Sequence, residues 1–147
     1  MEMLDGVEKI FDQMKPMMKK LKKASYEQNM EGFRRENGHY FREMVDYVEE
    51  AGQKEEAAKE IAVLFTEKVG EKFGGKKKIS GILQADLNFF MIYYVFPSIL
   101  LTGSDCAKTT ADAVCAEWGN RFKDSKINYA DYDTIYKGFR EKIFGIF

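Results

Sequence analysis

Histidine, proline and cysteine are scarce in this chain, whose 147 residues include one His, two Pro and two Cys. Histidine is the most common general base near neutral pH, so a single copy removes most hydrolytic and acid–base mechanisms. Two prolines leave room for long helices. Cys106 and Cys115, placed on one helix, would lie about 13 Å apart along its axis, too far for a disulfide. We therefore expect a reduced, cytoplasmic protein without enzymatic activity.

An excess of charge of either sign is also missing. The chain carries 23 Lys+Arg and 24 Asp+Glu, for a formal net charge of -1, so no overall field attracts nucleic acid or an anionic membrane. Lysines cluster at 15–23 and 76–78, but no aromatic residues are interleaved with them, as nucleic-acid binding would favour. We therefore expect no nucleic-acid partner. The opening MEMLDGVEKIFDQM lacks the basic start and the apolar core of a signal peptide.

Strand-like alternation of polar and apolar residues is absent as well, and apolar residues instead recur every three or four positions. This pattern predicts an all-α fold in a single domain, residues 1–147. We expect a five- or six-helix bundle around one central, fully apolar helix at about residues 79–101. The predicted helices cover residues 4–21 (interrupted at Pro16), 26–52, 53–73, 79–101, 107–122 and 132–143. The last residues, IFGIF, are too apolar to stay in solvent, so we expect this tail to dock onto the body.

The predicted central helix has a second interpretation. Residues 87–104 contain no charge and are long enough to be a candidate membrane span. However, Pro97-Ser98 interrupts the run at its most apolar point, and Asn88 lies near its start. A core helix covered by five amphipathic helices explains the same residues, so we expect no membrane partner.

The single histidine belongs to Glu36-x-x-His39, a spacing that places two metal ligands on one helix face in di-iron bundles. Such a site needs a second Glu-x-x-His, for which the sequence has no histidine. On a continuous helix, His39 also points about 160° away from the apolar stripe, toward solvent. The segment GEKFGGKK departs from a phosphate-binding loop because Lys77 replaces the Ser or Thr that holds magnesium. We expect neither a metal nor a cofactor.

Three polar residues interrupt apolar stripes and are candidate ligand-binding residues. Asn37 falls within the stripe of the second helix, where it could fix helix register, bind a ligand in a cavity, or cap a helix break at Asn37-Gly38. Asp86 is the one acid on the central helix, either buried as a functional carboxyl or exposed in the first turns, where the helix dipole favours it. Tyr93 lies seven residues further on the same side.

Two functions fit these features. The first is a protein–protein interaction module, with a protein partner or a second copy bound through the stripes of residues 4–21 and 26–48. The alternative is a bundle with an internal cavity for a small apolar ligand, oriented by Asn37, Asp86 or Tyr93. An enzyme would most simply use Asp86 with a tyrosine, but no catalytic constellation is evident.

Overall fold

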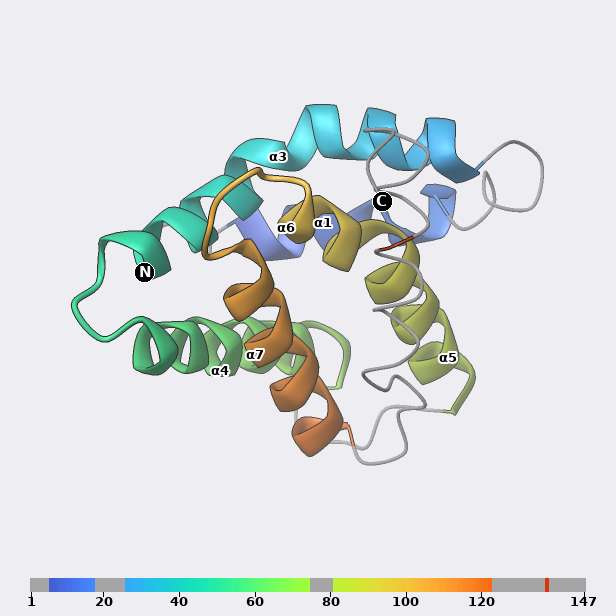
Figure 1. Ribbon diagram of the computed structural model, residues 1–147. Coiled ribbons are helices and arrows are strands. Elements are labelled where there is room, and N and C mark those ends of the chain that lie inside the picture. Colours follow the sequence, from blue (N-terminus) through green and yellow to red (C-terminus); the bar gives the residue numbers. More distant parts are fainter. Residues whose placement is uncertain (1–5, 18–25, 75–80, 123–136, 138–147) are drawn as a thin grey trace.

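The computed structural model describes residues 6–17, 26–74, 81–122 and 137, and every regular element in these ranges is helical (Figure 1). The all-α class is therefore confirmed. The predicted sixth helix, the apolar tail and both lysine clusters lie wholly or largely outside the described residues. The elements are α1 (Val7–Asp12), α3 (Tyr26–Glu50), α4 (Lys54–Phe73), α5 (Gly81–Phe90), the π-helix η2 (Met91–Val95), α6 (Phe96–Leu100) and α7 (Ala107–Arg121).

Helix α3 runs without interruption through Asn37-Gly38, as the spacing of its apolar residues predicts, so the alternative of a helix break capped by Asn37 does not apply. A glycine inside a helix costs about 1 kcal/mol relative to alanine. Burial of a continuous stripe outweighs this cost, because each large apolar side chain removed from water contributes about 1.5–3 kcal/mol. The buried stripe of α3 consists of Met30, Phe33, Asn37, Phe41, Met44, Val45 and Val48.

Helices α5, η2 and α6 follow one another as a single rod from residue 81 to residue 100. Pro97 has no N–H to donate to the carbonyl of Tyr93, so a regular α-helix is not possible there. The helix widens there into a π-turn, in which the N–H of Phe96 donates to the carbonyl of Met91. Ser98 Oγ donates to the carbonyl of Tyr94 at 2.6 Å. The π-turn thus lets the apolar rod pass the proline.

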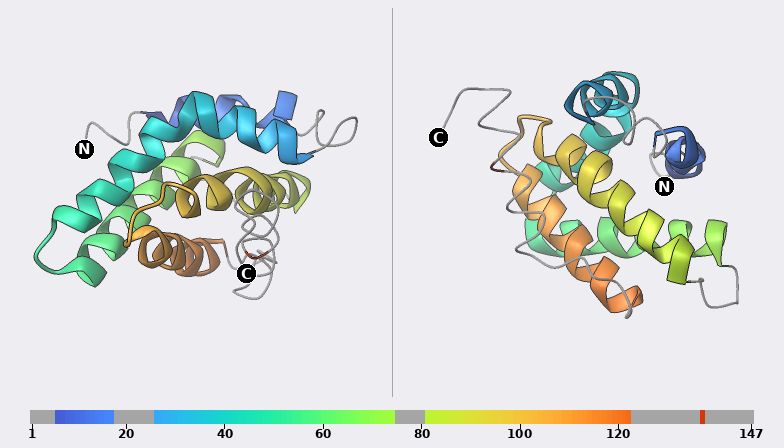
Figure 2. Two further views of the ribbon diagram at one scale, coloured as in Figure 1. Left: turned by 45° about the horizontal axis from the view of Figure 1, so that its top comes forward. Right: turned by 90° about the vertical axis from the view of Figure 1, so that its right-hand side faces the viewer.

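This rod is less central than the sequence suggests. All five residues of α6 are buried, but Gly81, Ile82, Ala85, Asp86 and Phe89 of α5 are exposed. Helix α3 packs on α4, η2 and α6, while α7 packs on α4 and α6. The two further views show α5 continuing past these contacts toward the edge of the molecule (Figure 2). The predicted enclosure therefore holds for the second half of the rod only.

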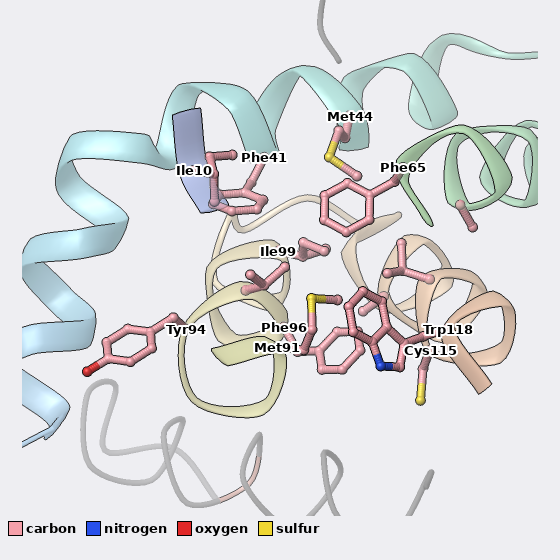
Figure 3. Packing of buried hydrophobic residues seen from close by; sticks show 14 of the residues in the cluster. Ile10, Phe41, Met44, Phe65, Met91, Tyr94, Phe96, Ile99, Cys115 and Trp118 are labelled. Carbon is pink, nitrogen blue, oxygen red and sulfur yellow. The ribbon is translucent and has the colours of Figure 1, made fainter. Parts of the chain in front are cut away.

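Aromatic side chains join the helices in the core. The Phe90 ring lies 5.2 Å from that of Phe11 and 5.4 Å from that of Phe33, between centroids, which links α5 to α1 and α3. Tyr94 OH donates to the carbonyl of Met17 at 3.2 Å, and burial raises the pKa of Tyr94. Around Trp118, side chains from several helices converge (Figure 3). Bulky Phe, Met and Trp side chains share this core with Val and Ile.

The connection from α6 to α7 is fastened to α3. Gly103 adopts a left-handed conformation, with φ of 82°, which suits glycine at a helix C-terminus. Ser104 Oγ donates to Glu49 Oε2 at 2.9 Å, and Arg42 donates to the carbonyl of Thr102 at 3.0 Å. These contacts fix the start of α7 against the C-terminal half of α3.

Among the described residues, one helix is long and apolar enough to cross a membrane by length and composition, Gly81–Leu100. Its apolar window is 61% buried inside the protein. Buried core helices of soluble proteins reach the same length and apolar composition as membrane spans.

Candidate functional site on the outer face of helix α5

Asn37 is buried, with 3% of its surface exposed, and faces Gln13 at the C-terminal end of α1. The two amides pair reciprocally: Gln13 Nε2 donates to Asn37 Oδ1 at 2.9 Å, and Asn37 Nδ2 donates to Gln13 Oε1 at 3.0 Å. Asn37 Nδ2 also donates to the carbonyl of Phe33 at 2.9 Å. The buried amide is therefore satisfied within the subunit, and the pair fixes α1 against α3.

This arrangement bears on the roles that the sequence suggests for Asn37. A polar contact that sets helix register is present, but it is intramolecular. A ligand in this position would have to replace Gln13, since both functional atoms of the Asn37 amide already have partners. The ligand-binding role of Asn37 stays a prediction.

Asp86 and Tyr93, by contrast, share one side of the rod with two exposed apolar residues. Ile82, Asp86, Phe89 and Tyr93 follow in steps of four, three and four, which places them in line on a helix. Ile82 is 82% exposed and Phe89 is 47% exposed, and Asp86 between them is exposed too. The Phe89 and half-buried Tyr93 rings stack, with centroids 5.2 Å apart and planes 18° apart. We call these four residues the α5 strip.

The inner face of α5 explains why the strip faces outward. Trp118 Nε1 of α7 donates to the buried Asn88 Oδ1 at 3.0 Å. Gln84 Nε2 donates to the carbonyl of Phe122 at 3.5 Å, just beyond the end of α7. Because these two contacts fix the rotation of α5 about its axis, the residues opposite them are held in solvent.

The sequence alone could have indicated part of this surface. Asp86 is the only charged residue between 81 and 100, and a charge on an otherwise apolar helix marks its exposed side. Residues at three- and four-residue spacing from Asp86 would then be exposed with it. Ile82 and Phe89 were missed because the segment was treated as apolar and buried all round.

The stripes of the first two predicted helices do not form such a surface. The described part of the first stripe is buried in the hydrophobic core through Val7, Ile10, Phe11, Met14 and Met17, as is the stripe of α3. Both are used inside the subunit, so self-association through them would require the fold to open. An intermolecular surface has to be sought elsewhere.

The remaining sequence candidates lie apart from the α5 strip. His39 is exposed, as its position opposite the stripe predicts, and its ring contacts that of Tyr40. Cys106 and Cys115 are buried and form no disulfide. In residues 6–17, 26–74 and 81–122, no three His, Cys, Asp or Glu side chains gather as a metal site would require.

No protein-family model, curated protein or solved structure gives a significant match to this chain.

Proposed function

We propose that the protein acts by binding, and that the α5 strip docks an amphipathic helix of a protein partner. The exposure of Ile82 and Phe89 carries this proposal. They are the only large hydrophobic residues exposed in the part of the chain that the structure describes, and both lie on one face of one helix. Apolar surface concentrated in this way is typical of interaction sites.

The dimensions and chemistry of the strip define the partner. From Ile82 to Tyr93 it extends about 16 Å, or three helical turns. A helix with apolar residues at three- and four-residue spacing matches this length and shape. Asp86 lies in the middle of the strip, so the partner helix should carry a lysine or arginine there. An exposed ion pair contributes only about 0.2–1 kcal/mol, and its main effect is on orientation and selectivity.

A second copy of the chain fits the strip less well. Stable interfaces bury roughly 1,200–2,000 Å² in total, more than a strip of four side chains supplies. Two copies meeting through this face would also bring one Asp86 toward the other. The same carboxylate disfavours insertion into lipid, because membrane-surface helices present lysine and arginine around their apolar face.

The test uses isotope-labelled full-length protein and a model peptide of about 14 residues, four helical turns, made of leucine and lysine with an amphipathic pattern. We expect the peptide to shift amide NMR resonances of Gly81–Tyr93 selectively. A matched leucine/glutamate peptide should bind at least about threefold more weakly, because Asp86 repels it.

Two variants make the result specific. Phe89→Asp should weaken the leucine/lysine peptide at least about tenfold, since it places a charge in the apolar strip. Ala116→Asp, at an exposed position of α7, should leave binding unchanged. Shifts spread over other helices, or equal binding by Phe89→Asp, would refute the proposal.

A further inference from the structure

We infer that Asp86 and Phe89 of the α5 strip, together with the neighbouring Ala85, form a subsite that selects arginine over lysine in the partner helix. This inference rests on the proposed function, because it specifies the basic residue that the partner places opposite Asp86. Arginine and lysine carry the same charge but differ in shape and in hydrogen-bonding geometry. The subsite therefore distinguishes partners by more than their charge.

The carboxylate of Asp86 is the charged part of the subsite. Asp86 is exposed, and residues 81–107 contain no lysine or arginine, so no basic side chain lies within one turn of it on its own helix. Its two oxygens can accept two parallel N–H groups from one guanidinium, whereas an ammonium acts as a single point charge. This carboxylate therefore gains more from an arginine than from a lysine.

The Phe89 ring is the aromatic part of the subsite. Tyr93 follows one turn later and stacks on Phe89, with centroids 5.2 Å apart and planes 18° apart, so it covers the ring face directed toward the C-terminal end of the helix. The other face is directed toward the preceding turn, because helical side chains lean toward the N-terminus. Asp86 belongs to that turn, three residues before Phe89, which is itself 47% exposed.

Ala85 leaves the space between these two groups open. It is exposed and lies four residues before Phe89, on the turn over which the ring leans. A larger side chain here would cover the uncovered ring face, whereas a methyl group leaves room for a flat guanidinium. The guanidinium can then stack on Phe89 while its N–H groups donate to Asp86. A lysine ammonium has no plane to stack, so it combines the two contacts less well.

Two peptides of equal length and pattern measure this selectivity on the full-length protein. The leucine/lysine peptide is compared with a leucine/arginine peptide by amide NMR titration. We expect the leucine/arginine peptide to bind at least about threefold more tightly, because the bidentate pair and the stacked cation both favour it. In an isotope-labelled leucine/arginine peptide, Cδ protons of arginine should also shift upfield, since they lie over the face of the Phe89 ring.

Three variants at exposed positions remove the parts of the subsite one at a time. Phe89→Leu keeps an apolar side chain without the ring, and should reduce the arginine preference to about 1.5-fold or less and abolish the upfield shift. Asp86→Asn keeps the size of the side chain without its charge, and should weaken both peptides and reduce the preference. Ala85→Leu should reduce the preference without weakening the leucine/lysine peptide. Ala116→Leu, at an exposed position of α7, is its matched control.

The comparison of each variant with the native protein removes any difference that belongs to the peptides themselves. Equal binding of the two peptides by the native protein would overturn the inference. An arginine preference that is unchanged in Phe89→Leu or in Ala85→Leu would overturn it too, since the preference would then arise outside the subsite.

Failure of the subsite is distinguishable from failure of the proposed function. If both peptides shift the resonances of Gly81–Tyr93 with equal affinity, the arginine subsite is refuted and the docking surface stands. If neither peptide shifts these resonances, the proposed function is refuted, and the subsite with it.

Discussion

The reciprocal amide pair between Gln13 and Asn37 offers a sharp test of what holds α1 to α3. We consider Gln13→Met and Asn37→Leu, each of which replaces an amide by an apolar side chain of similar shape. The free energy of unfolding of both single variants and of the double variant forms a thermodynamic cycle. The two residues contact each other directly, so their effects should not add.

The single changes should differ in size. Gln13→Met removes the partner of Asn37 Oδ1 at a site with 3% exposure. An unsatisfied buried acceptor costs about 1–3 kcal/mol, so we expect a loss of about 2 kcal/mol. Gln13 is only half-buried and also donates weakly to the carbonyl of Lys9 at 3.3 Å. Asn37→Leu leaves this more accessible amide partly hydrated and adds apolar surface to the core, so we expect a loss of about 1 kcal/mol.

The double variant shows whether the Gln13 and Asn37 amides depend on each other for their hydrogen bonds. With both amides gone, no buried polar group is left without a partner, and two apolar side chains meet in a core that is already apolar. Replacing both members of a buried pair by apolar groups is often close to neutral. We therefore expect stability within about 0.5 kcal/mol of the native protein and a coupling energy of about 2–3 kcal/mol.

Urea denaturation followed by far-UV circular dichroism and Trp118 fluorescence measures all four proteins. Equal m-values would show that the denatured states are comparable. Simple additivity, with the double variant losing about 3 kcal/mol, would refute the reasoning. It would mean that the two amides are satisfied independently and do not fix α1 on α3.

Three further predictions concern other positions. A Cβ on Gly6 would lie 2.2 Å from the Tyr40 ring, so Gly6→Ala should destabilise the protein by about 1–3 kcal/mol in urea denaturation. Gly38→Ala, at a helical position with no atom within 4 Å of the new Cβ, should instead stabilise it by about 0.5–1 kcal/mol in the same assay. The side-chain hydrogen bond with Glu60 raises the pKa of Tyr47 above its usual 10.0, and burial of the Tyr47 side chain adds to this rise. Glu60→Gln should therefore lower the midpoint of Tyr47 ionisation in an ultraviolet titration, and the stabilisation from this contact should be present below pH 10 and lost as the pH rises through the raised pKa.

The sequence predicted the helices of this protein better than their orientations. The three- and four-residue spacing across Asn37-Gly38 correctly indicated one continuous helix, because burial of a stripe outweighs the local turn preference of the pair. The same phase placed Asn37 in the core and His39 in solvent. Its partner Gln13 could not be predicted, since pairing across 24 residues depends on how α1 settles on α3.

Helix α5 shows why the candidate site was harder to predict. Helix α5 has polar residues on both sides, Asp86 on one and Gln84 and Asn88 on the other, so only the charge of Asp86 indicates which side is exposed. That choice is made by contacts with α7, from Asn88 to Trp118 and from Gln84 to Phe122. These contacts exist only once α7 is in place, and they are not visible in the local sequence of α5.

The α5 strip is an apolar surface on the outer side of a helix whose inner side contacts α7. A helix that served only to fill the core would lose nothing by carrying polar residues on its outer face, and solubility would favour them. The outer face of α5 instead carries Ile82 and Phe89, with a single acid between them. Single exposed apolar residues are ordinary, but two in line with a stacked tyrosine form a continuous surface. The proposed partner, an amphipathic helix with a lysine or arginine opposite Asp86, would cover this surface and pair with its single charge.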